Sequence, residues 1–131
     1  MSSPFRLVSD ILVFAGEDEV IVNGIGASKK LKIPEEVALW LKSSFAARRV
    51  LEELVTHYKF RRRLCNPGAL RSLILLLYAR YNNIPPYKVA RNYGVPPEQL
   101  YRMERGLKKD NLLELVKNMA EKPEEPKLGR Y

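Results

Sequence analysis

The sequence is short of several residues that carry chemistry in other proteins. Among 131 residues there is one cysteine, Cys65, and one histidine, His57. A single cysteine excludes an internal disulfide and a cysteine-based metal cluster, and a single histidine excludes a histidine-rich metal site. Paired catalytic carboxylates, a glycine-rich phosphate loop and a nucleophile–histidine set are also missing as motifs. We therefore expect no enzyme activity, no cofactor and no small-molecule substrate.

Long hydrophobic runs are absent as well. The longest, Leu73–Ala79, is far below the roughly 18 residues that cross a bilayer, and the N-terminus lacks the basic-then-apolar pattern of a signal peptide. With 46% hydrophobic residues, a folded protein is expected, and the missing membrane and signal segments favour a cytoplasmic location. A single Gln and a single Thr beside 29% charged residues are typical of proteins from thermophiles.

Acidic residues are missing from one long segment. Residues 54–97 contain eight basic and no acidic side chains, whereas residues 1–53 and 98–131 are close to neutral. The whole net charge of +8 therefore lies in the middle of the chain. A solvated basic face is the ordinary explanation of a charge run, but a segment this long favours a surface that contacts phosphates.

The first third of the chain has the pattern of a small sheet followed by a helix. Ile11–Phe14 and Val20–Val22 are apolar and β-branched with a turn between them, which predicts a hairpin. Lys29–Ile33 is expected to add a short third strand. A short helix begins at Pro34, and Trp40 on its apolar face is expected to anchor the hairpin in the core; an exposed stacking role is the alternative.

A longer helix is predicted from Phe45 to Leu64, after an N-cap at Ser43-Ser44. Its apolar residues recur at helical spacing. Three consecutive arginines at its end exceed what the helix dipole requires, so we also expect them to contact a DNA backbone: Arg61, Arg62 and Arg63. His57 is interpreted as a surface residue with no special role.

Asn66-Pro67-Gly68 is expected to break the chain into two subdomains. Residues 1–65 are predicted to form a β-hairpin and helix subdomain for packing or dimerisation, with Cys65 as an inert small hydrophobe. A helical unit follows in 66–121, and its first helix, Ala69–Tyr81, is apolar nearly all round and therefore buried on more than one side. The Pro- and charge-rich tail, 122–131, is expected to be flexible.

Two short helices joined by a tight turn are predicted around Gly94. Each begins with a proline pair, Pro85-Pro86 or Pro96-Pro97, because proline suits the first helical turn. Leu100 and Met103 are three residues apart and share the buried face of the second helix. Its polar residues are therefore expected to face outward.

This stretch resembles the Xre family of lambda-repressor-like helix-turn-helix domains. The matching positions are Val89-Ala90, Gly94-Val95, Leu100, Arg102 and Glu104-Arg105-Gly106, followed by an amphipathic segment from Asn111. The resemblance covers residues 67–121 and implies a four- to five-helix domain whose partner is double-stranded DNA. It also implies a structural ion pair between Arg80 and Glu104.

The chain departs from the family pattern at three places. Pro86 and Pro97 stand where polar residues that contact a phosphate or a base are common, and the connection before Pro85 lacks its glycine. The departures bear on the phosphate and base contacts more than on the fold.

The resemblance also implies roles for individual side chains. The second helix of such a motif enters the major groove and meets base edges with its first residues, here Pro97, Glu98, Gln99, Tyr101 and Arg102. For Glu98 the alternative is a favourable charge at a helix N-terminus. Contacts to the DNA backbone are expected, besides the three arginines above, from Lys88, Arg91, Arg105, Lys108 and Lys109.

Together these features predict an α+β, mostly α protein. We expect it to act in the nucleoid as a sequence-specific transcriptional regulator that binds duplex DNA as a homodimer. The alternative is a non-enzymatic adaptor associated with replication, the nucleoid or RNA, in which the helix-turn-helix serves as a protein-interaction scaffold. Phe14–Glu17 with Leu31–Ala38 looks similar to the small β-domain of archaeal GINS replication subunits, which supports the alternative.

Overall fold

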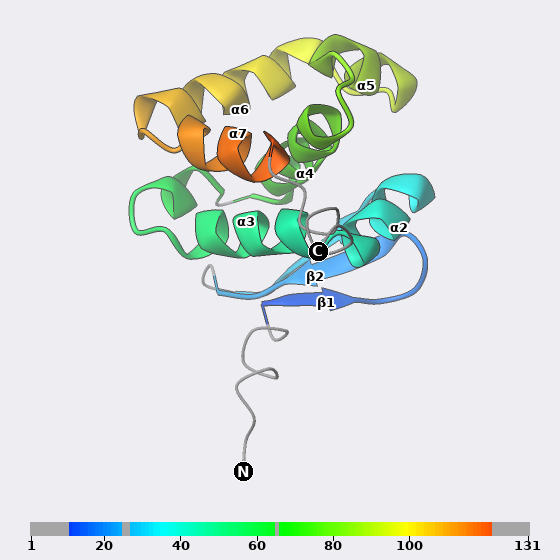
Figure 1. The fold of residues 1–131 in the computed structure, drawn as a ribbon. Coiled ribbons are helices and arrows are strands. Elements are labelled where there is room, and N and C mark those ends of the chain that lie inside the picture. Colours follow the sequence, from blue (N-terminus) through cyan, green and yellow to red (C-terminus); the bar gives the residue numbers. More distant parts are fainter. Residues whose placement is uncertain (1–10, 25–26, 65, 122–131) are drawn as a thin grey trace, which may run out of the picture.

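The computed structural model describes residues 11–24, 27–64 and 66–121, with side chains as far as Lys117. A small antiparallel sheet is followed by a set of helices, so the chain is α+β and mostly α, as predicted (Figure 1). Cys65 and the tail from residue 122, for which the sequence predicted an inert side chain and a flexible segment, lie outside the described residues.

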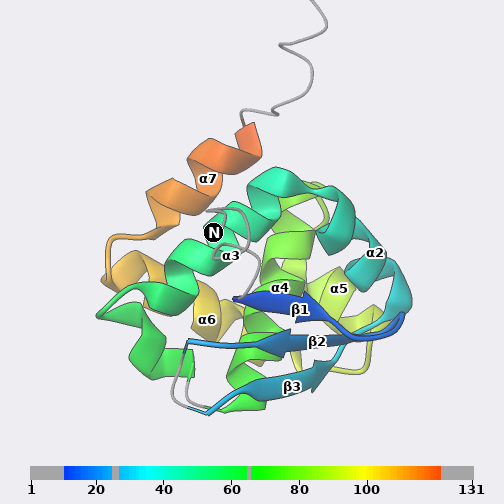
Figure 2. The same cartoon turned by 90° about the horizontal axis from the view of Figure 1, so that it is seen from below.

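The sheet has the strand order β1-β2-β3, with β1 at Leu12–Phe14, β2 at Glu19–Val22 and β3 at Lys29–Lys32. Both strand pairs are antiparallel, which confirms the predicted hairpin and third strand. Seen from below, one face of the sheet is open and the helices lie behind the other face (Figure 2). Alternate apolar residues are buried against those helices: Leu12, Val20, Val22 and Leu31.

Two helices follow the sheet, α2 at Glu35–Ser43 and α3 at Phe45–Thr56. Ser44 separates them, and its hydroxyl accepts a hydrogen bond from the backbone N–H of Ala47 at 3.1 Å. The predicted N-cap is therefore present.

Trp40 of α2 is half-buried and packs against the core, as predicted, and it also contacts a later helix, which the sequence did not predict. Its ring lies edge-on to Tyr78 and Tyr81, with centroid distances of 5.3 and 5.9 Å. Such edge-to-face pairs stabilise beyond the area that they bury. Trp40 thereby fastens the N-terminal segment to the C-terminal helices.

The predicted continuous helix from Phe45 to Leu64 is wrong. α3 ends at Thr56, His57 has extended backbone angles, and a separate 3₁₀ helix, η1, spans Phe60–Leu64. The Nδ1 atom of His57 accepts hydrogen bonds from the backbone N–H groups of Lys59 and Phe60, at 3.2 and 3.4 Å. His57 therefore caps η1 and has a structural role that the sequence interpretation denied it.

The remaining helices surround α4 (Pro67–Tyr81), which is the centre of the core. α5 (Pro86–Asn92), α6 (Pro97–Lys109) and α7 (Leu113–Glu121) pack against it, as do α2, α3, η1 and β3. α4 is buried on all sides, which explains why so few of its residues are polar. One continuous hydrophobic core therefore includes residues from both sides of the predicted boundary at Asn66.

α4, α5 and α6 end in the same way. A residue with positive φ follows each one, and the next backbone N–H donates to the carbonyl five residues earlier, which is a Schellman motif. The three residues are Asn83 (φ 56°), Gly94 (φ 70°) and Asn111 (φ 61°). The corresponding bonds are Ile84 to Ala79 at 2.9 Å, Val95 to Ala90 at 2.9 Å, and Leu112 to Leu107 at 2.8 Å. Asn83 thus supplies the left-handed residue before Pro85, where the chain lacks the glycine of the family pattern.

This turn makes a testable prediction for Asn83. We expect Asn83→Ala to lower the free energy of unfolding by about 1 kcal/mol, because a β-carbon without a polar side chain disfavours the left-handed region. Asn83→Gly is the control and should leave stability nearly unchanged, since glycine adopts positive φ readily. Urea denaturation measures both variants, and equal losses would contradict the role assigned to the backbone angle.

Candidate nucleic-acid interface

One face of α6 is exposed along its length. Its apolar residues Leu100, Met103 and Leu107 are buried against neighbouring helices, while Glu98, Arg102 and other polar residues lie on the outer side. α6 occupies the side of the molecule opposite the sheet (Figure 1). The outer side of the helix is therefore accessible to a large partner.

The five residues predicted to meet bases lie together on the first two turns of α6. Pro97, Glu98, Gln99 and Arg102 are exposed and Tyr101 is half-buried. Glu98 and Arg102 form an ion pair with each other at 3.8 Å, with side chains 72% and 69% exposed. A pair this exposed contributes little, so either side chain is free to exchange it for another contact.

Gln99 has a different environment. The hydroxyl of Ser72, on α4, donates a hydrogen bond to its Oε1 atom at 3.4 Å. Ser72 itself is buried. The hydroxyl of Ser72 therefore helps to orient the amide of Gln99.

A polar cleft of about 470 Å³ lies beside these residues, between the first turns of α4 and α6. Its lining comes from both helices and from η1: Arg63, Asn66, Gly68, Ala69, Ser72, Gln99, Arg102 and Met103. Two guanidinium groups beside a helix N-terminus suit an anion such as a phosphate. Sequence reasoning missed this cleft because its walls come from segments that only the tertiary fold brings together.

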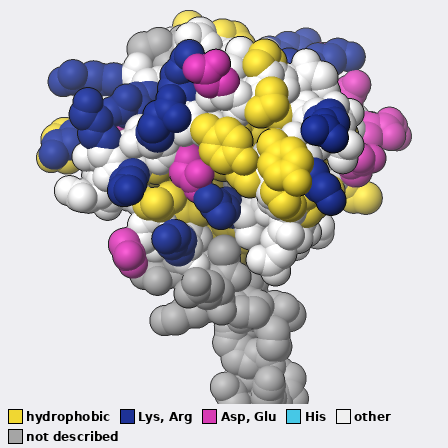
Figure 3. Space-filling view, turned by 90° about the horizontal axis from the view of Figure 1, so that it is seen from above, with side chains coloured by type: hydrophobic (Ala, Val, Ile, Leu, Met, Phe, Trp, Pro, Cys, Tyr) yellow, Lys and Arg dark blue, Asp and Glu magenta, His cyan; other side chains and the backbone are white. Residues whose placement is uncertain are grey.

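All eight cations predicted to contact a DNA backbone are exposed: Arg61, Arg62, Arg63, Lys88, Arg91, Arg105, Lys108 and Lys109. Seen from above, Lys and Arg side chains gather on one side of this face, beside a hydrophobic patch (Figure 3). Exposed apolar surface is also present on α5, where the ring of Tyr87 is 42% exposed and lies 5.8 Å from the guanidinium of Arg91. The face thus combines positive charge with aromatic surface.

Arg63 is exposed, but its side chain also makes a structural contact. Its Nε donates to the carboxylate of Asp110 at 3.0 Å, which ties η1 to the end of α6. A β-carbon on Gly106 would lie 3.0 Å from Cδ of Arg63, so glycine leaves room for the arginine to cross the helix. The sequence interpretation found neither partner, since Arg63 and Asp110 are 47 residues apart.

Arg80 and Glu104 form the ion pair that the family resemblance implied. Their side chains are 39% and 17% exposed, so the pair is partly buried between α4 and α6. It fixes α6 on the central helix from the side opposite to its outer face.

The Asp110 contact predicts a pH dependence. The guanidinium of Arg63 hydrogen-bonds the Asp110 carboxylate and lowers the pKa of that carboxyl. A carboxyl whose pKa is lower in the folded than in the unfolded protein stabilises the fold at pH values above its unfolded-state pKa. This stabilisation is lost as pH falls through the folded-state pKa. Between about pH 6 and about pH 2, we expect wild type to lose up to about 1 kcal/mol more than Asp110→Asn. Urea midpoints at both pH values measure this, and parallel losses would contradict the contact.

Three further observations concern the described part of the chain as a whole. No helix in it is long and apolar enough to cross a membrane. No three His, Cys, Asp or Glu side chains in this part come close enough together to hold a metal ion. Comparison of the chain with protein-family models, with curated proteins and with solved structures gave no match.

Proposed function

We propose that this protein binds duplex DNA, with α5 and α6 as a helix-turn-helix and α6 in the major groove. The observation that carries the proposal is the exposed outer side of α6, together with eight exposed cations on α6 and on α5 and η1, which pack against it. A helix fits the major groove and cations neutralise the phosphates on either side. The likeness of Val89–Gly106 to the Xre pattern supports the same reading, and a sequence-specific transcriptional regulator is the function that follows.

Specific reading of bases depends on two side chains in this proposal. Arg102 suits guanine, to which a guanidinium donates two hydrogen bonds, and Gln99 suits adenine. The weak Glu98 contact does not hold Arg102 away from a base, because both side chains are exposed. Lys88, Arg91 and the cations at the end of α6 position the helix without reading sequence.

Arg102→Ala provides the test. A preferred site is first selected from random duplexes, and affinity is then measured by fluorescence anisotropy. We expect the variant to lose about 1–3 kcal/mol on that site, roughly 5- to 150-fold, and to relax one base position. The matched control is Lys109→Ala, which should weaken binding to every duplex equally. Uniform loss by Arg102→Ala would show that Arg102 does not read a base.

A second candidate is a non-enzymatic adaptor that uses this face to bind a protein. The hydrophobic patch beside the cations favours it, since exposed aromatic surface such as Tyr87 is typical of protein interfaces. Failure of the selection to enrich any duplex, together with binding that depends only on salt, would favour this candidate over the regulator.

A further inference from the structure

β1 is an edge strand of the described sheet, and no other described strand pairs with its outer side. The carbonyl of Ile11 accepts from Asn23 at 2.9 Å, and the N–H of Ala15 donates to Glu19 at 3.0 Å. Because hydrogen-bonding directions alternate along a strand, the N–H and C=O groups of Leu12 and Phe14 point away from β2. Such an edge is a template for one more strand.

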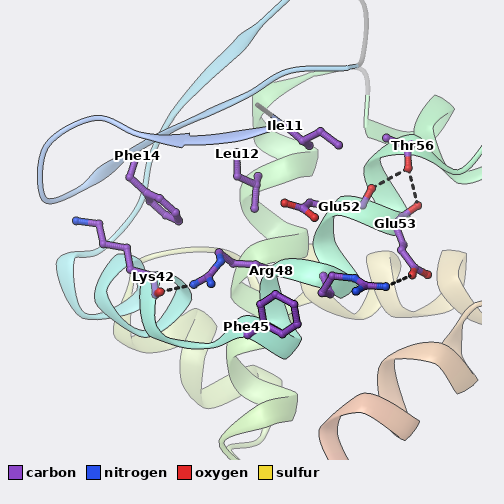
Figure 4. Close-up of a pocket in the computed structure, with 10 residues that line it drawn as sticks. Ile11, Leu12, Phe14, Lys42, Phe45, Arg48, Glu52, Glu53 and Thr56 are labelled. Carbon is purple, nitrogen blue, oxygen red and sulfur yellow. Dashed lines mark hydrogen bonds and ion pairs between the residues drawn. The ribbon is translucent and has the colours of Figure 1, made fainter. Parts of the chain in front are cut away.

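An apolar groove of about 840 Å³ adjoins this edge, between β1 and α3. Figure 4 shows Phe14 and Leu12 on one wall and Phe45 on the other. Phe45 is 52% exposed, which is unusual for a phenylalanine. An open strand edge beside exposed aromatic surface is a docking surface for an extended segment.

The groove is charged in opposite senses at its two ends (Figure 4). Near Phe14 stands Lys42, whose ammonium lies 5.6 Å from the ring centroid, with Arg48 beyond it. Glu52 stands nearer Ile11, whereas Glu53 pairs with Arg49, which also lines the groove, at 3.6 Å.

The described residues form no hydrogen bond or ion pair with the Glu52 carboxylate, although the positive charges of Arg48 and Arg49 act on it. Its side chain points toward β1 (Figure 4), and burial raises the pKa of its carboxyl. A partly buried carboxylate in this position gains from an external cation.

We propose that a second copy of this chain docks in the groove, with the two β1 strands antiparallel about a twofold axis normal to the sheet. Such an axis reverses one groove relative to the other, so the Lys42 end of each copy meets the Glu52 end of its partner. The surface is self-complementary in charge and in hydrogen bonding, as a closed twofold interface requires. Centred on Val13, the register pairs Leu12 of one copy with Phe14 of the other.

One consequence of this dimer rests on the proposed function. The sheet is seen face-on from below and α6 lies on the opposite side of the molecule, so the axis runs from the sheet toward α6 (Figures 1 and 2). Both copies of α6 then face the same side, which a twofold DNA site requires. The dimer itself depends only on the groove and the edge.

The test is charge-swap complementation, read by sedimentation equilibrium of the full chain, whose monomer mass is 15.1 kDa. Wild type should be dimeric at micromolar concentrations. Lys42→Glu and Glu52→Lys should each raise the dimer dissociation constant about tenfold or more, because like charges then meet. An equimolar mixture of the two variants restores opposite charges in both halves of the heterodimer and should recover wild-type association. Lys88→Glu is the control with the same charge change outside the groove.

Recovery in the mixture supports the proposal and also shows that neither variant is misfolded. A wild-type chain that remains monomeric throughout the micromolar range would overturn it, and so would a dimer that both substitutions leave intact. Lack of recovery in the mixture would do the same. Duplex binding is measured separately, so a monomer that binds DNA rejects only the dimer, and a dimer that does not bind rejects only the proposed function.

Discussion

Binding of the wild-type chain to duplex DNA is expected to weaken by about 10³-fold or more when salt rises from about 50 to 200 mM. Eight exposed cations lie on α6 and on α5 and η1, which pack against it. Each phosphate that they neutralise releases condensed counterions, and the release becomes less favourable as salt concentration rises. Six or more such contacts give a loss of this size. Fluorescence anisotropy with one labelled duplex over a salt series measures it.

Single substitutions measure how much each lysine contributes to this salt dependence. Lys108→Gln and Lys109→Gln should each reduce the slope of log affinity against log salt by about 1, whatever the duplex sequence. Lys30→Gln removes an equal charge from β3, on the opposite side of the molecule, and should leave the slope unchanged. A slope near zero for wild type, or an equal effect of Lys30→Gln, would rule out the face that carries α6 as the contact surface.

Phe60→Ala is expected to lower the free energy of unfolding by about 3–5 kcal/mol. Phe60 is fully buried and is the largest such side chain among the described residues. It lies at the start of η1, directly before three arginines, so its ring anchors the segment that carries them. Removing the ring leaves a cavity in the core, and the cost of this cavity adds to the lost burial of the side chain. Urea denaturation followed by circular dichroism measures the loss.

Tyr58→Ala is the matched control, two residues earlier in the chain. The Tyr58 side chain is 71% exposed and stacks on His57 at a centroid distance of 5.2 Å. Its removal should change stability by no more than about 0.5 kcal/mol, as is usual for surface residues. Similar losses in both variants would mean that general disturbance of the turn, and not burial of Phe60, stabilises η1.

Local features of the fold could be read from the sequence. The apolar, β-branched runs around Val13 and Ile21 and the turn between them identify the hairpin, because such residues favour strands. Ser44 identifies a helix start, because its hydroxyl replaces a missing backbone partner. The uniformly apolar helix now labelled α4 identifies the core, since a helix without a polar face must be covered on every side. Each feature depends on residues only a few positions apart.

Signals of the same kind were present but overlooked. An asparagine or glycine before an apolar residue recurs at Asn83, Gly94 and Asn111, and marks three helix ends. Of these three residues, only Gly94 led to a predicted turn, because glycine is the usual residue at positive φ and asparagine is the rarer substitute. The break at His57 also leaves a trace in the sequence, since Phe60 and Leu64 would fall on the side of a continuous helix opposite Leu51 and Val55.

By itself, the sequence determined the order and kind of the elements except for the break between α3 and η1, the segment without acidic residues and the polar outer side of α6. Only the tertiary structure decided that Arg63 meets Asp110, that Trp40 packs on α4, that a polar cleft opens beside Gln99, and that β1 borders a groove with opposite charges at its ends. The physical reason is the distance along the chain over which each kind of interaction acts. Hydrophobic period and capping act within one or two turns of chain, whereas these contacts join segments whose distance in space is set by packing of the whole core.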